Sequence, residues 1–168
     1  MAVTALDAQS ANVHFITVSQ LAADPSEPVR AAAAEKLGLC GSRGLKALAT
    51  CESDAAATVR EATATAYGEI GDASALGWLA DAASSDGDRQ VREAAVAAIG
   101  AIGHPDGIDP LLALIADGPP QVRRRAIAAI TVFDDPRVEP AIRRAALDRN
   151  PGVKEAAEMI VGRQIREA

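Results

Sequence analysis

The side chains that could do chemistry are few in this sequence and stand far apart. His14 and His104, the only two histidines, are ninety residues apart, and Cys40 and Cys51 match no CxxC metal or redox spacing. No nucleophile elbow, glycine-rich phosphate loop or clustered Cys/His set is present. We therefore expect no catalytic residue, no metal site and no bound cofactor. The two cysteines are predicted to be small packing residues of a reduced, intracellular protein.

One charged pattern, in contrast, is regular. An aspartate stands five residues before a valine at five places, the valines are spaced by 30, 32, 31 and 31 residues, and a basic residue follows each valine. The pattern could form a basic stripe for an acidic partner, but its fixed spacing favours neutralised structural pairs. The predicted ladder consists of Asp24/Arg30, Asp54/Arg60, Asp86/Arg92, Asp117/Arg123 and Asp148/Lys154.

Two helices in each unit must position this ladder. After each valine, apolar residues recur at offsets of 3, 4, 7, 8 and 11, which is one face of an α-helix. Upstream of four of the aspartates, a turn starts another helix, with Ser42, Asp72, His104 and Asp135 at N-cap positions. A glycine usually follows near the end of the second helix, which indicates a helix stop or a close approach between helices. These glycines are Gly38, Gly68, Gly100 and Gly162.

Composition narrows the possible functions. Apolar residues make up 49% of the 168 residues and aromatic residues only 2%, which favours thin, alanine-rich helices over a wide sandwich. The net charge of −6 argues against a general nucleic-acid binder, which needs a basic face. The first twenty residues carry no signal-peptide or membrane-span pattern, so we expect a cytoplasmic protein with no membrane association.

An aspartate five residues before Val-Arg, followed by an alanine-rich helix in units of ~31 residues, resembles the HEAT superfamily, and in particular the phycobilisome lyase HEAT-like repeats. The resemblance runs from about residue 12 to the end. It implies a right-handed stack of antiparallel helix pairs with the second helices on a concave face, and aspartates and arginines that cap turns and link units. The iron-binding His-Glu pairs of the HEAT-like deoxyhypusine hydroxylases are absent.

We accordingly predict an all-α fold, an α-solenoid of about five HEAT-like helix pairs that forms a single domain over residues 1–168. Its units are predicted at residues 11–38, 39–69, 70–101, 102–132 and 133–168.

A candidate binding surface follows from the second helices. Positions 2, 5, 6 and 9 after each valine lie off the core stripe, and there an apolar strip with a charged rim is typical of a protein-binding groove. The alternative is that the curvature of the stack buries the strip. Val96 and Ile127 are the predicted apolar anchors. The full set of predicted concave-face contacts is Glu61, Ala64, Glu93, Val96, Arg124 and Ile127.

The two ends of the chain differ in charge, because residues 1–118 carry a net charge of −9 and residues 119–168 carry +3. The basic end could steer an acidic partner, drive head-to-tail self-association or be an ordinary solvated surface. The predicted function is a non-catalytic adaptor or scaffold that binds a partner protein on its concave face. The alternatives are a phycobilin-lyase-like maturation factor or chaperone for a cofactor-bearing client and, less favoured, a HEAT-like nucleic-acid binder.

Overall fold

The computed structural model describes residues 14–167, with the side chains of residues 163–167 left out. Residues 11–13 of the first predicted unit, residue 168 of the last one and the first thirteen of the twenty N-terminal residues that lack a signal-peptide pattern therefore lie outside the described residues. From residue 14 to residue 167 the regular elements are all helical and no strand occurs, as the sequence predicts.

Ten α-helices form five consecutive pairs within residues 14–167. The first helices are α2 (Phe15–Leu21), α4 (Leu45–Leu48), α6 (Leu76–Ser85), α8 (Ile108–Asp117) and α10 (Val138–Ala145). The second helices are α3 (Glu27–Gly38), α5 (Ala57–Ile70), α7 (Arg89–Ile102), α9 (Pro120–Ile130) and α11 (Pro151–Glu167). Short 3-10 turns at Gly41–Gly44, Ala73–Ala75 and Pro105–Gly107 lead into α4, α6 and α8.

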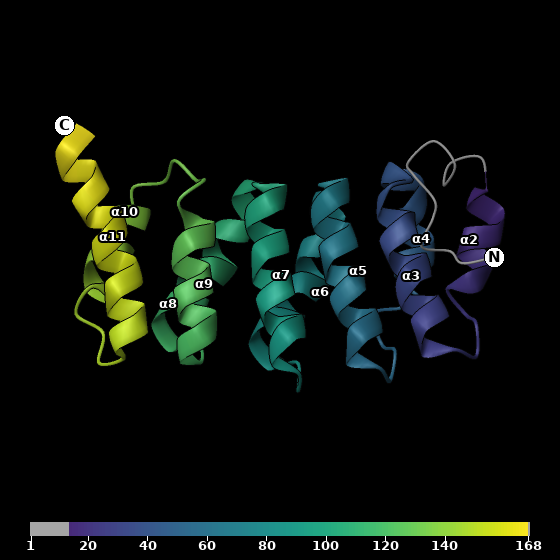
Figure 1. The fold of residues 1–168 in the computed structure, drawn as a ribbon. Helices are drawn as coiled ribbons and strands as arrows, with labels where there is room; N and C mark the ends of the chain where they lie inside the picture. The colour runs from purple at the N-terminus through teal and green to yellow at the C-terminus, as the bar shows by residue number, and fades with distance from the viewer. Residues whose placement is uncertain (1–13, 168) are drawn as a thin grey trace.

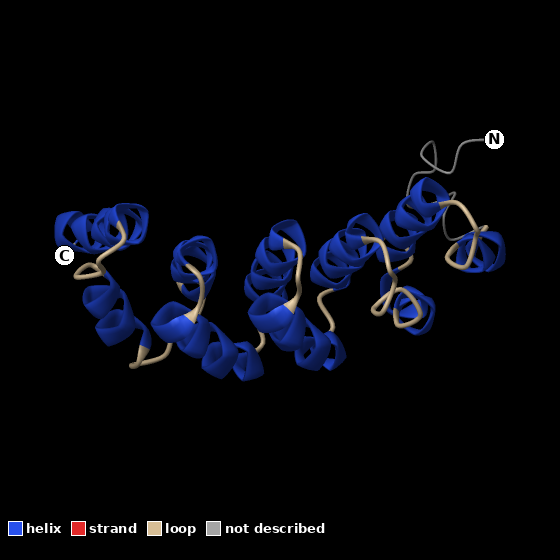
Figure 2. Cartoon of the chain, turned by 90° about the horizontal axis from the view of Figure 1, so that it is seen from below, coloured by secondary structure: helices blue, strands red, loops and turns tan. Residues whose placement is uncertain are grey.

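The pairs stack side by side in a single row (Figure 1). Each second helix packs on the next, from α3 through α5, α7 and α9 to α11. Seen from below, roughly along the helix axes, the row is bent into an arc whose inner side is lined by the second helices, while α4, α6, α8 and α10 form the outer layer (Figure 2). The predicted solenoid with second helices on its concave face is therefore present.

The start of the first helices depends on side-chain caps. Asp72, His104 and Asp135 each accept a hydrogen bond from the amide two residues further on, at 2.9, 3.3 and 2.9 Å. Ser42, in contrast, makes no capping bond, because it lies inside the 3-10 turn that begins after Cys40. The N-cap prediction for Ser42 is therefore wrong, and α4 is correspondingly short.

A continuous core runs the length of the stack between the two layers. Four of the five ladder valines are completely buried, and they share one core cluster with apolar side chains of the outer helices such as Leu79 and Leu111. Removing a side chain of this size from water contributes about 1.5–3 kcal/mol. Cys40 and Cys51 are buried free thiols in this core, and burial raises the pKa of both, so they pack rather than react.

Glycine sets the spacing of the second helices. A Cβ atom added at Gly68 would lie 3.0 Å from the Cα atom of Ala98, and one added at Gly100 would lie 2.9 Å from the Cβ atom of Ala129. Gly38 is crowded against α5 in the same way. For Gly38, Gly68 and Gly100, close approach between helices is therefore the role that the structure shows, whereas a Cβ atom added at Gly162 would meet nothing within 4 Å. Helices α5 and α7 end instead at the left-handed glycines Gly71 and Gly103.

Candidate protein-binding surface

The predicted apolar anchors do not face the concave surface. Ala64, Val96 and Ile127 each have 0% of their surface exposed, so their assignment as partner contacts is wrong. The physical reason is the angle around the helix. Position 5 after the valine lies only about 40° from the ladder arginine at position 1, which reaches toward the next unit. This flank of each second helix is therefore packed against its neighbour rather than open to a partner.

Positions 2 and 6 after the valine form the actual concave surface. At position 2 stand Glu61 and Glu93, both half-buried, and Arg124, which is exposed. At position 6 stand Thr65, Ala97 and Ala128, all exposed. The charged residues among the predicted contacts therefore remain available to a partner, whereas the apolar ones do not.

Two adjoining hollows lie on the N-terminal half of this surface. A hollow of about 570 Å³ lies between α5 and α7, and one of about 440 Å³ lies between α3 and α5. Both are lined by Glu61, Thr65 and Glu69, so together they form one groove across three helices. Glu61 and Glu69 form no ion pair with the described residues, whereas Glu93 lies 3.6 Å from Arg89. We call the two hollows the α3–α7 groove.

The ladder charges lie at the edge of the stack, away from this groove. Arg60 donates from Nη1 to the carbonyl oxygen of Asp54 in its own turn and, from Nε and Nη2, to both carboxylate oxygens of Asp86 in the next unit, at 2.8 and 2.9 Å. These hydrogen bonds hold the pKa of Asp86 below its usual range. The pairs formed in this way are Arg30–Asp54, Arg60–Asp86 and Arg123–Asp148.

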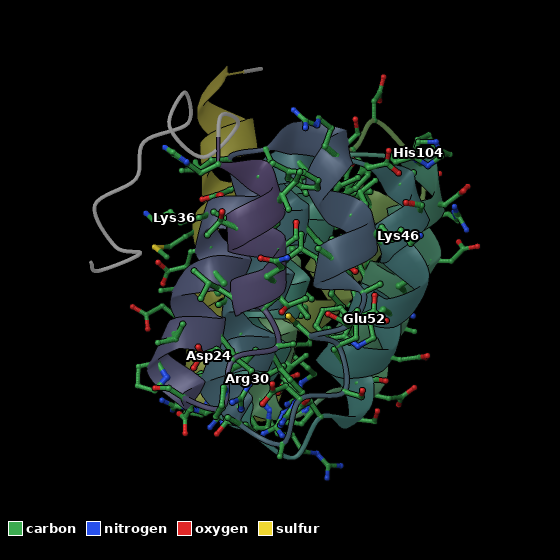
Figure 3. All side chains as sticks on the ribbon, turned by 90° about the vertical axis from the view of Figure 1, so that its right-hand side faces the viewer. Asp24, Arg30, Lys36, Lys46, Glu52 and His104 are labelled. Atoms are coloured by element: carbon green, nitrogen blue, oxygen red, sulfur yellow. The ribbon has the colours of Figure 1, made fainter. Side chains whose placement is uncertain are left out.

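The first and last charged residues of the ladder, Asp24 and Lys154, have different interaction partners from the residues between them. Asp24 has no preceding arginine, and its carboxylate accepts the amide of Ser26 at 2.8 Å, which caps the turn before α3. Figure 3 places Asp24 and Arg30 together at the lower edge, with Lys36 and His104 on opposite sides of the stack. Lys154, at the other end, is exposed and lies 3.7 Å from Glu158. The ladder therefore supports the solenoid and does not form a basic stripe.

One rung of the ladder, meaning one ion pair between an arginine and the aspartate of the next unit, is missing. Arg92 binds the carbonyl oxygen of Asp86, but its buried Nε has no partner among the described residues. Asp117, the expected partner, is exposed at the end of α8, so its place in the ladder is a correction to the prediction. In the intact rungs, the amide two residues after the aspartate donates to the aspartate Oδ1. Here that residue is Pro119, which has no N–H and cannot hold the carboxylate in place.

Groups of the kind that bind metals are not assembled in this part of the chain. Between residues 14 and 167, no three His, Cys, Asp or Glu side chains gather in a way that could hold a metal ion. None of the helices described has the length and apolar character required to cross a membrane.

Sequence reasoning missed some of the residues that line the groove. Glu69 and Ala101 stand ten residues after their valines, one turn beyond position 6, and both are exposed. The helical repeat of about 3.6 residues could have found them, because positions 2, 6 and 10 lie within about 80° of one another.

Comparisons with known proteins agree with this architecture. The family model for HEAT repeats matches residues 16–100, 45–121 and 108–167. No curated protein matches the sequence. Among solved structures, the complex of CpcE and CpcF of phycocyanin lyase from Nostoc sp. PCC7120 is similar, with a TM-score of 0.71 and 19% identity over 88% of this chain and 97% of that chain. A designed armadillo repeat protein in complex with the peptide (KR)4 has a TM-score of 0.63 and 17% identity over 93% of this chain and 86% of that chain. At these identities, the similarity concerns the fold.

Proposed function

The chain belongs to the HEAT-repeat family, and from this premise we propose that it is a non-catalytic adaptor or scaffold that holds a segment of a partner protein on its concave face. The observation that carries the proposal is the α3–α7 groove, a continuous hollow over three helices. Its length suits an extended or helical polypeptide better than a compact metabolite.

The charged side chains that line the groove indicate which kind of partner segment it would favour. Four carboxylates and three basic groups line the two hollows: Glu35, Glu61, Glu69 and Glu93, and Lys36, Arg89 and Arg125. Glu61 and Glu69 lie on the wall that the two hollows share and form no ion pair with the described residues, whereas Glu93 lies 3.6 Å from Arg89. Lysine or arginine side chains of a partner would complement Glu61 and Glu69, and such complementarity raises the rate and the specificity of association. The similar designed armadillo repeat protein forms a complex with the peptide (KR)4, which is consistent with this use of a stacked-helix face.

Affinity capture with the full chain tests the proposal. Partners captured from a lysate of the source organism would be identified by mass spectrometry, with wild-type protein compared to the double variant Glu61→Arg and Glu93→Arg. The matched control is Asp81→Arg with Asp106→Arg, which makes the same charge change at exposed positions of the outer layer. We expect a partner that wild type and control retain and the groove variant loses.

The proposal is wrong if every captured partner binds the groove variant as well as it binds wild type. Analytical ultracentrifugation of the purified chain would then show whether the protein instead associates with itself.

A phycobilin-lyase-like maturation factor is the second proposal, and it rests on the similarity to the phycocyanin lyase structure. The hollows found on the described residues are lined by no aromatic side chain, which a tetrapyrrole would be expected to stack on. Mixing the purified chain with a bilin and recording the absorption spectrum tests it, since an unshifted band would remove this candidate.

A further inference from the structure

A separate hollow opens on the same concave face between α9 and α11, with a volume of about 380 Å³. Its walls are the side chains of Ala128, Ala156, Met159 and Ile160, and the buried Ile127 lies at its base. Met159 is 62% exposed, which is unusual for a large apolar residue in this chain. The volume falls within the range of small binding pockets, about 300–1,000 Å³.

The junction between α9 and α11 also differs in sequence from the preceding junctions. At the preceding junctions, a glycine nine residues after the valine lets the next helix approach closely, as Gly100 does against Ala129. At the corresponding position, α9 has ended at Ile130 and is followed by Thr131, whose hydroxyl donates to the carbonyl oxygen of Ala128 at 2.7 Å. A threonine side chain cannot fit where even a Cβ atom is crowded. The upper part of α11 accordingly leans away from α9 (Figure 1).

Positive charge borders this apolar hollow on its α9 side. Arg124 and Arg125 both line it, both are exposed, and neither forms an ion pair with the described residues. Arg125 also lines the hollow between α5 and α7, so the two sites adjoin there. The third charged residue of α9, Arg123, differs because it is held by Asp148. An apolar hollow beside two uncompensated guanidinium groups complements an apolar side chain with carboxylates next to it.

End-to-end stacking of a second copy does not explain the hollow. At position 5 after the valine, where the other second helices carry buried apolar residues, α11 carries the exposed Glu158, paired with Lys154 at 3.7 Å. Another helix packed there would bury that charge, which is unfavourable without a new partner. The hollow also faces the concave side, beside the α3–α7 groove, and not the end of the row.

We propose that the α9–α11 hollow binds one large apolar side chain of an acidic polypeptide segment, whose flanking carboxylates pair with Arg124 and Arg125. The unbranched, polarisable side chain of Met159 adapts to leucine, isoleucine, methionine or phenylalanine alike. This inference rests on the proposed function and deepens it, since it concerns the same concave face. It also predicts how acidic and basic residues are arranged along the partner segment. Acidic residues with an apolar anchor lie over α9 and α11, and basic residues lie over α5.

A direct titration tests the inference without a known partner. The probe is a short fluorescein-labelled peptide in which a single leucine is flanked on both sides by glutamates, titrated with the full chain and followed by fluorescence anisotropy. We expect saturable binding that weakens by ~10- to 100-fold when the leucine of the peptide is replaced by glycine, since burying a leucine side chain contributes that much to an affinity. A peptide with lysines in place of the glutamates should not bind at this site.

Matched variants locate the binding. Ala128→Trp fills the hollow and should abolish binding, whereas Ala113→Trp, at an exposed alanine of α8 in the outer layer, should leave it unchanged. Arg124→Glu with Arg125→Glu should also abolish binding. If Ala128→Trp fails to fold by circular dichroism, Met159→Asn provides the second variant, since its exposed side chain can change without disturbing the core.

The inference is overturned if the peptide does not bind, if its glycine version binds equally well, or if Ala128→Trp retains full affinity. It is also overturned if a fatty acid or a second copy of the chain, but not the peptide, occupies the hollow. These outcomes differ from a failure of the proposed function, because the captured partner and the α3–α7 groove variant are measured independently.

Discussion

The Arg60–Asp86 rung offers a sharp test of how the repeat units are joined. Replacing Asp86 by asparagine keeps Oδ1, which accepts from the amide of Asp88 and from Nη2 of Arg60, at 2.8 and 2.9 Å. It replaces Oδ2, which accepts from Nε of Arg60 at 2.8 Å, by an NH₂ group. Donor then faces donor, and the largely buried guanidinium, with 18% of its side chain exposed, loses its counter-charge.

The expected loss follows from these contacts. A hydrogen bond to a charged group contributes about 2 kcal/mol, and the asparagine removes one such bond together with the charge. In a chain of this length, 1 kcal/mol corresponds to about 2–4 °C in Tm. Asp86→Asn should therefore lower Tm by about 4–8 °C in scanning calorimetry, with an equivalent loss in urea unfolding.

The chain supplies its own control for this experiment. Asp117 occupies the same repeat position as Asp86 but is exposed and holds no rung with Arg92. Asp117→Asn makes the same chemical change and should leave Tm unchanged. Equal effects of the two substitutions would refute the reasoning, because the loss could then not come from the inter-unit ion pair.

The pH dependence of the unfolding free energy tests the Arg60–Asp86 pair independently. Hydrogen bonds from Arg60 hold the pKa of Asp86 below its usual value, so the stabilisation is complete above the unfolded-state pKa of ~3.9 and is lost as pH falls through the folded-state value. The difference in unfolding free energy between wild type and Asp86→Asn should thus be constant near neutral pH and shrink below about pH 4. A difference that grows on acidification would contradict this mechanism.

The remaining predictions concern helix spacing and the missing rung. Gly100→Ala should destabilise by about 1 kcal/mol, because crowding against Ala129 outweighs the gain in helix propensity, whereas Gly77→Ala, at an open and exposed position of α6, should stabilise by up to about 1 kcal/mol in urea unfolding. Pro119→Ala restores the amide that orients the aspartate in the intact rungs. A double-mutant cycle between Arg92 and Asp117 should then give a coupling of about 1 kcal/mol that is close to zero in wild type, and no coupling in either background would refute the role given to the proline.

The fold could be predicted because its signals are local and repeated. The valine at the same place in each unit, the apolar offsets after it and the aspartate before it each report on one helix or one turn. Repetition at a fixed spacing then forces neighbouring units into equivalent contacts, so a pattern along the sequence becomes a stack in space. Side-chain caps such as Asp72 follow from the same local logic.

The binding surface could not be predicted in the same way. Whether Val96 is exposed depends on how closely the next helix approaches, and that distance is set by Gly100 and its contact on Ala129 rather than by anything near Val96. The missing rung likewise results from Pro119, which lacks the amide that holds the aspartate in other turns.

The sequence by itself therefore determined the number, order and pairing of helices, because these follow from periodicity within about thirty residues. Only the tertiary structure decided which flank of each second helix is buried, where the α3–α7 groove lies and that α9 and α11 stand apart. The physical reason is that a hollow is the space left between two packed helices, so its place and size depend on contacts between residues that lie far apart in the sequence.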